Sequence, residues 1–175
     1  MKKTLVLIAC LSVAFNAYAQ KFSVPKDYKF NVEADYRSYE QDILKAIYWL
    51  ENTPVLDEKT KREEVNTFVF QWIEGCPYVH ITLGEVIVNL FEKQTAENLM
   101  IFIAGWIKYA LTNKDYDNQV KGSLAGIEAA INYYEKNKKW TGKDAGVEKY
   151  IKMKKKGTLT KYVEKIVEKE KLEMQ

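Results

Sequence analysis

The chain has few of the residues that build metal centres and disulfide frameworks. Its 175 residues include two cysteines and one histidine, and Cys76 is the only cysteine beyond the first twenty residues. One thiol and one imidazole are too few ligands for the spaced cysteine and histidine motifs of zinc sites. The glycines form no phosphate-binding loop. The sequence therefore predicts no metal site, no cofactor and no disulfide within the mature chain.

An excess of one charge sign is also missing. The chain has 27 basic and 24 acidic residues, and two of the lysines, Lys2 and Lys3, lie at the extreme N-terminus. Without that segment the balance is 25 to 24, which removes the global electrostatic case for a nucleic-acid partner. A local basic cluster at Lys152 and 154–156 is typical of a solvated helix face, and contact with an anionic surface is the alternative.

Residues 1–19 have the three parts of a secretory signal peptide. Lys2 and Lys3 precede an apolar run over residues 5–15, and Ala17-Tyr18-Ala19 fits the small-residue cleavage site. Cleavage is therefore predicted between Ala19 and Gln20, with the mature protein periplasmic or secreted. The alternative is a lipoprotein signal ending at Cys10, but it would have an apolar region of about four residues where roughly 7 to 15 are usual.

Long hydrophobic runs are limited to one segment of the mature chain, residues 95–113. Between Leu99 and Leu111 the only charged residue is Lys108. A membrane span needs roughly 20 apolar residues, so this shorter run predicts a central helix buried on every side and no transmembrane helix. Thr95 is predicted to cap its start.

The periodicity of the remaining chain predicts an all-α fold in one domain over residues 35–175, preceded by an extended arm over residues 20–34. We expect six or seven helices, paired in antiparallel hairpins around the central one. Asp35 and Asp57 are the predicted caps of the first two helices, and residues 78–83 are a candidate short strand. The other predicted helices cover residues 36–52, 58–74, 84–92, 115–137, 144–156 and 160–173.

Small residues predict where the central helix meets its neighbour. Gly122, Gly126 and Ala129 form one face of the 115–137 helix, and we expect this face to pack against the Ala104-Gly105 region. A pocket in this seam would suit a small-molecule carrier. The candidate binding residues are therefore Trp72, Trp106, Tyr109, Gly122 and Gly126.

Two residues suggest a catalytic alternative. Cys76 and His80 are a possible thiol and imidazole pair for a cysteine-dependent hydrolase. In an extended segment, however, side chains four residues apart lie about 13 Å from each other, at roughly 3.3 Å per residue. No catalytic residue is therefore predicted. Asp115 and Asp117 open a calcium-loop pattern that fails where Val120 replaces the required glycine.

Four segments, in this order, resemble a family of small exported α-helical proteins of Gram-negative bacteria to which we can attach no activity. These are DILKAIYWLENTP, KREEVNTFVFQWIEGCP, ENLMIFIAGWIKYALTN and LAGIEAAINYYEKN. The resemblance implies export and a helical domain, and it implies no catalytic residues. The predicted export, the missing site chemistry and the abundance of aromatic residues predict a non-catalytic binding or interaction module of the cell envelope. Its partner would be another envelope protein or an envelope component, and the alternative is a small-molecule carrier.

Overall fold

The computed structural model describes residues 22–92 and 95–173, so the predicted signal peptide and its cleavage site lie outside the described residues. The described residues form an all-α single domain, which confirms the predicted fold class. The pairing of helices in antiparallel hairpins stays a prediction. Eight helices lie in the described part of the chain: α1 (Glu33–Ser38), α2 (Glu40–Asn52), α3 (Lys59–Gly75), α4 (Glu85–Leu90), α5 (Ala96–Asn113), α6 (Gln119–Thr141), α7 (Ala145–Lys155) and α8 (Leu159–Glu173).

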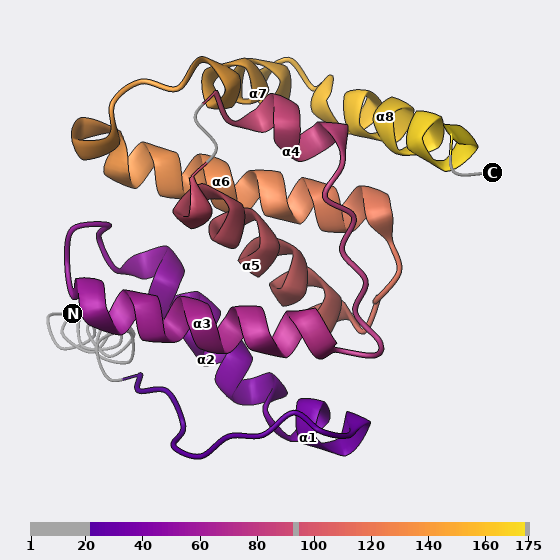
Figure 1. Ribbon diagram of the computed structural model, residues 1–175. Coiled ribbons are helices and arrows are strands. Elements are labelled where there is room, and N and C mark those ends of the chain that lie inside the picture. The colour runs from indigo at the N-terminus through magenta and orange to yellow at the C-terminus, as the bar shows by residue number, and fades with distance from the viewer. Residues whose placement is uncertain (1–21, 93–94, 174–175) are drawn as a thin grey trace, which may run out of the picture.

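The helices form three layers (Figure 1). The middle layer is α5 with α6, the pair with the most extensive mutual packing in the described chain. Helices α1 to α3 lie on one side of this pair, and α4, α7 and α8 lie on the other. Two clusters of buried apolar side chains fill the spaces between these layers, one on each side of α5.

Helix α5 is the buried central helix that the sequence predicts. Ile103 and Ile107 belong to the cluster between α5 and the helices α2 and α3. Phe102 and Trp106 belong to the cluster on the other side of α5, which faces α7 and α8. The helix begins as predicted, since the Thr95 hydroxyl oxygen accepts a hydrogen bond from the Asn98 N–H at 3.2 Å. Among the described residues, no helix combines the length and hydropathy needed to cross a membrane.

The small-residue seam between α5 and α6 is tightly closed. A Cβ atom at Gly105 would lie 2.6 Å from the Cβ of Ala129 and 2.7 Å from the backbone oxygen of Ala125. One at Gly126 would lie 2.7 Å from the Phe102 ring, and one at Gly122 would overlap the Trp106 indole. The glycines therefore make room for the neighbouring helix and its aromatic side chains.

The start of the helical domain differs from the prediction. Helix α1 begins at Glu33, inside the predicted arm, and the expected 36–52 helix is interrupted at Tyr39. Asp35 is wrong as the N-cap: it lies in the first turn, where its carboxylate accepts hydrogen bonds from the N–H groups of Asn31 and Val32 at 2.8 and 3.1 Å. Residues 22–32 contain no helix or strand.

Two further expectations in the first half of the chain are wrong. Asp57 does not cap α3; the N-cap residue is Glu58, which has a left-handed backbone and no side-chain capping bond. Residues 78–83 form no strand, and no other strand exists in the described residues to pair with them. Val79 is buried in the core instead, and the Tyr78 hydroxyl donates a hydrogen bond to Glu40 at 2.9 Å.

The C-terminal helices follow their sequence signals more closely. The Asp144 carboxylate accepts the Val147 N–H at 3.1 Å and so caps α7, and Gly157, with φ of 68°, separates α7 from α8. Helix α6 extends past the predicted end to Thr141. Its last turn carries Trp140, whose side chain is 45% exposed and has the Lys139 Nζ 3.9 Å from its ring centre.

Candidate functional site

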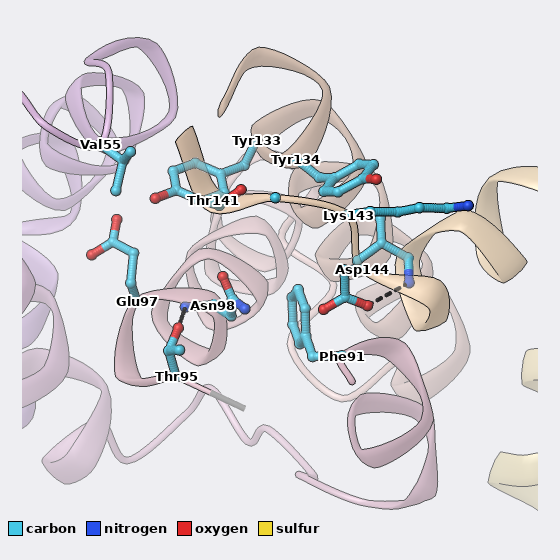
Figure 2. A pocket seen from close by; sticks show the side chains of 12 residues that line it. Val55, Phe91, Thr95, Glu97, Asn98, Tyr133, Tyr134, Thr141, Lys143 and Asp144 are labelled. Carbon is cyan, nitrogen blue, oxygen red and sulfur yellow. Dashed lines mark hydrogen bonds between the residues drawn. The ribbon is translucent and has the colours of Figure 1, made fainter. Parts of the chain in front are cut away.

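A cavity of about 330 Å³ lies where the start of α5 meets the end of α6. Five parts of the chain contribute to it: Val55 of the α2–α3 connection, Phe91 and Thr95 from between α4 and α5, the start of α5, the end of α6, and the α6–α7 connection with the start of α7 (Figure 2). We call the exposed lining residues 141–143, at the α6–α7 connection, the mouth of the cavity. The lining residues are Val55, Phe91, Thr95, Glu97, Asn98, Tyr133, Tyr134, Thr141, Gly142, Lys143, Asp144 and Val147.

Most of the cavity wall is apolar. Val55 and the Tyr133 ring lie at one end, and Phe91 and Tyr134 lie towards the other (Figure 2). Val147 also lines the cavity. Small-molecule sites are typically concave and mainly apolar, with a few polar groups that fix the orientation of the ligand. The wall therefore has the character of a binding site for a small organic molecule.

The Tyr133 hydroxyl is the unusual polar group of this cavity. Tyr133 is 4% exposed, and its buried hydroxyl meets no partner with full hydrogen-bond geometry in the described part of the chain. Burial raises the pKa of Tyr133, and the nearby Glu97 carboxylate raises it further through its charge and as a hydrogen-bond acceptor, so the phenol stays protonated at neutral pH. A buried hydroxyl with an incompletely formed hydrogen bond costs folding free energy.

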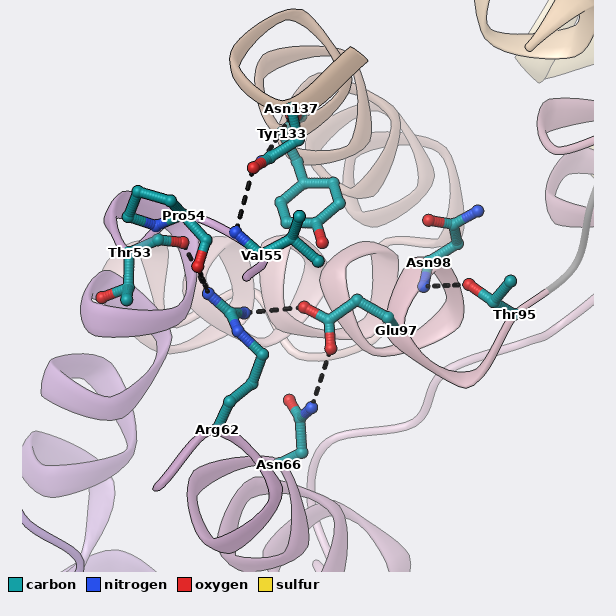
Figure 3. A network of polar contacts seen from close by, with 10 residues as sticks. All are labelled: Thr53, Pro54, Val55, Arg62, Asn66, Thr95, Glu97, Asn98, Tyr133 and Asn137. Carbon is teal, nitrogen blue, oxygen red and sulfur yellow. Dashed lines mark hydrogen bonds and ion pairs between the residues drawn. The ribbon is translucent and has the colours of Figure 1, made fainter. Parts of the chain in front are cut away.

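Glu97 lies beside this hydroxyl and is held by two partners from α3 (Figure 3). Arg62 Nη1 donates to Glu97 Oε1 at 2.7 Å, and Asn66 Nδ2 donates to Glu97 Oε2 at 3.0 Å. The Arg62 side chain is 6% exposed and that of Glu97 is 20% exposed, so little water screens the pair. Each carboxylate oxygen accepts one bond from these partners, which leaves lone pairs for a further donor.

The same arginine fixes the connection between α2 and α3. Arg62 Nη2 donates to the carbonyl oxygens of Thr53 and Pro54 at 2.5 and 3.3 Å (Figure 3). From the opposite side, the buried Asn137 accepts the Val55 N–H at 3.0 Å and donates to the Tyr133 carbonyl at 2.9 Å. Val55 is thereby held over the cavity by contacts with both α3 and α6.

The mouth is built around the capped start of α7. The Asp144 carboxylate accepts the N–H of Glu92 at 3.1 and 3.2 Å in addition to that of Val147, and the Glu92 carboxylate accepts the Ala145 N–H at 3.2 Å. Gly142 stands between α6 and α7 with φ of 84° and ψ of −175°, a region that is accessible almost only to glycine. Lys143 points its amine away from the cavity (Figure 2).

The residues predicted as a binding surface lie elsewhere. Trp72 and Trp106 are buried in the two core clusters, and the Trp72 indole donates to the Tyr36 carbonyl at 2.9 Å. Gly122 and Gly126 lie in the closed seam. The Tyr109 hydroxyl donates to Asp115 at 2.5 Å, and partial burial together with that carboxylate raises the pKa of Tyr109 to about 12.

Cys76 and His80 have separate environments. Cys76 is buried, and this burial raises the pKa of its thiol, which lowers the fraction of reactive thiolate. His80 is exposed, and its Nδ1 lies 3.2 Å from Asp117 Oδ1. Within the described residues, no group of three or more histidine, cysteine, aspartate or glutamate side chains is arranged to hold a metal ion.

Sequence reasoning missed the residues that shape the cavity. Neither Tyr133 nor Glu97 is among the predicted binding residues, because the sequence pattern that gave those residues is the small-residue face of Gly122 and Gly126. A usable signal was Arg62, which lies three residues before Val65 on the buried face of α3. A charged residue on an apolar stripe indicates a buried partner, although the sequence does not identify it.

Comparison with known proteins gives no relative from which a function could be transferred: no protein-family model, curated protein or solved structure matches this chain.

Proposed function

We propose that the mature protein is an exported, non-catalytic binding protein of the cell envelope that carries a small, mainly apolar molecule in the cavity beside Tyr133. The observation that carries this proposal is the cavity itself, whose wall is mainly apolar and includes Tyr133 and Glu97. This combines the predicted binding module with the carrier alternative. The sequence-based carrier hypothesis expected the ligand in the α5–α6 seam. The present proposal instead puts the ligand in the cavity at the end of the same two helices.

The size of the cavity supports a small ligand. Its volume of about 330 Å³ is near the lower end of the roughly 300–1,000 Å³ that is usual for small-molecule sites. At ~30 Å³ for each water molecule in the liquid, it corresponds to roughly ten waters. A ligand of about ten non-hydrogen atoms is therefore the expected size.

The polar groups of the cavity favour binding over catalysis. Glu97 is held by Arg62 and Asn66, and Asp144 is held by backbone N–H groups at the start of α7. A carboxylate fixed in this way orders the chain around it. Cys76, the one thiol of the mature chain, does not line the cavity.

Binding is tested by adding 3-phenylpropan-1-ol to the purified protein and following its amide chemical shifts. Saturable changes are expected at residues that line the cavity. Val55→Trp should abolish them, because the indole would occupy the cavity. Leu56→Trp is the matched control, since Leu56 is the next residue, is exposed and is not part of the lining. Equal binding by the two variants, or no saturation in the unaltered protein, would contradict the proposal.

A further inference from the structure

We infer that the outer side of α7 and the α6–α7 connection form a docking face for an anionic phospholipid bilayer. We call this surface the basic face, and it consists of the exposed lysines of residues 136–161. Docking at the basic face is independent of the proposed function, because it concerns the outer surface of the protein and not the contents of the cavity.

The positive charge of the chain is concentrated in this one segment. Residues 136–161 contain ten lysines and two acidic residues, a net charge of +8, whereas the predicted mature chain has 25 basic and 24 acidic residues. The rest of the mature chain is therefore net negative. Exposed charges act over ~10 Å at about 0.1 M salt. A bilayer would consequently respond to the nearest face of the protein and not to its total charge.

The lysines of the basic face are available to a partner. All ten are exposed. Lys154 forms an ion pair with Glu128 at 2.5 Å, and Lys136 donates to the Glu51 carbonyl oxygen at 2.9 Å. Within the residues that the structure describes, the other eight form no ion pair: Lys138, Lys139, Lys143, Lys149, Lys152, Lys155, Lys156 and Lys161.

Helix α7 places part of this charge on its outer side. Its buried stripe includes Val147 and Tyr150. Lys149, Lys152 and Lys156 recur at spacings of three and four, so they lie along the opposite side of the helix. Because α7 belongs to an outer layer of the fold, this row of lysines faces solvent (Figure 1).

The acidic residues nearby do not cancel the charge. The carboxylate of Asp144 caps α7, and that of Glu148 accepts a hydrogen bond from the Tyr134 hydroxyl at 2.8 Å. Both are already included in the net charge of +8. Subtracting Glu128, the partner of Lys154, still leaves the basic face strongly positive.

Two features favour a bilayer over a nucleic acid. Residues 136–161 contain no arginine, the residue that recognises phosphates and base edges through paired hydrogen bonds. Lysines supply charge without a fixed geometry, which suits a fluid anionic lipid surface. In addition, Trp140 belongs to the same segment and is 45% exposed, with the Lys139 Nζ 3.9 Å from its ring centre. Tryptophan is favoured at membrane–water interfaces.

Co-sedimentation with vesicles, in the absence of any cavity ligand, tests the inference. Vesicles of phosphatidylcholine with about 30% phosphatidylglycerol are compared with vesicles of phosphatidylcholine alone. The test variant is Lys152→Gln/Lys156→Gln. The matched control is Lys29→Gln/Lys59→Gln, which removes two exposed lysines outside the basic face and changes the net charge equally.

We expect the unaltered protein to bind only the vesicles that contain phosphatidylglycerol. The test variant should bind them at least about tenfold more weakly, because each lysine near an anionic surface contributes a factor of roughly five. The control variant should stay within about twofold of the unaltered protein. Raising the salt from about 0.1 M to about 1 M should release the protein, because the Debye length falls from ~10 to ~3 Å.

Several results would overturn the docking face while leaving the cavity proposal to its own titration. Absence of binding, or equal binding to both kinds of vesicle, would exclude recognition of anionic lipid. Equal losses in the two double variants would show that net charge and not the basic face determines binding. Tighter binding to a short DNA duplex than to the vesicles would assign the face to a nucleic acid instead.

Discussion

The two helices α5 and α6 form a closed seam along their middle and an open cavity at one end, and the two regions differ in the size and polarity of their side chains. In the seam, glycine and alanine let the backbones approach until a single added methyl group would collide. At the end, tyrosines, a glutamate and the turns into neighbouring elements keep the chains apart. Small residues between helices therefore remove space, and the space for a ligand arises where larger residues prevent close packing.

The largest effect is expected from breaking the seam. Gly105→Val would place a branched side chain where a Cβ already meets Ala129 and the Ala125 carbonyl, so the helices must separate. Overpacking usually costs about 1–3 kcal/mol and occasionally more. A loss of about 4 kcal/mol in the free energy of unfolding is expected here, because the clash includes backbone atoms.

Urea titration followed by circular dichroism measures this loss. Lys165→Val, at an exposed position of α8, is the control for placing valine in a helix and should change the free energy of unfolding by less than about 1 kcal/mol. An equal loss in both variants would show that the seam does not require glycine.

The next largest effect is expected from breaking the ion pair between Arg62 and Glu97, at the cavity end of α5. Arg62→Met keeps most of the side-chain volume but leaves Glu97 without its cation and the Thr53 carbonyl without its donor. Removing one member of a buried ion pair costs about 3–5 kcal/mol. A loss of about 3 kcal/mol is expected because Glu97 is partly exposed.

The double variant Arg62→Met/Glu97→Gln separates the buried charge from general packing. It should recover about 1 kcal/mol or more relative to Arg62→Met, because the uncompensated charge is gone. Additive losses in the double variant would show that the ion pair does not hold this end together. Urea unfolding of the unaltered protein, of Arg62→Met, of Glu97→Gln and of the double variant gives the comparison.

How much of this arrangement could be predicted depends on the range of the interactions. The ends of α5 follow from local signals, namely the Thr95 cap and the uniform apolar run, and the capping by Asp144 is also local. The small faces correctly predict that α5 and α6 meet. The small-residue faces do not predict the cavity, because they indicate only where the two helices touch. They carry no information about the ends of the helices, where the cavity lies.

The rest depends on contacts between residues far apart in the chain. Arg62 and Glu97 are 35 residues apart, and Val55 and Asn137 are 82 apart. Each residue in isolation resembles an ordinary helix or loop position. Only the packing of α3, α5 and α6 brings these groups together, so no local periodicity could identify the cavity.

The smallest effect compares two buried tyrosines, Tyr133 of α6 and Tyr150 of α7. Tyr133→Phe removes a buried hydroxyl with an incompletely formed hydrogen bond, so it should stabilise the protein by about 0.5–1 kcal/mol. Tyr150→Phe removes a hydroxyl that donates to the Val86 carbonyl at 2.9 Å, so it should destabilise by about 1 kcal/mol. Thermal and urea unfolding of the two variants measure the difference, and the same sign in both would contradict the incomplete hydrogen bonding of Tyr133.

The position of Trp140 gives the protein a built-in optical reporter. Trp49, Trp72 and Trp106 are almost completely shielded from solvent, whereas Trp140 is 45% exposed and immediately precedes Thr141 at the cavity mouth. The shielded indoles should emit at short wavelength and resist quenching by acrylamide. Trp140 should emit at longer wavelength and be quenched readily. Acrylamide quenching of this one indole therefore follows the solvent exposure of the last turn of α6, without attaching a dye to the protein.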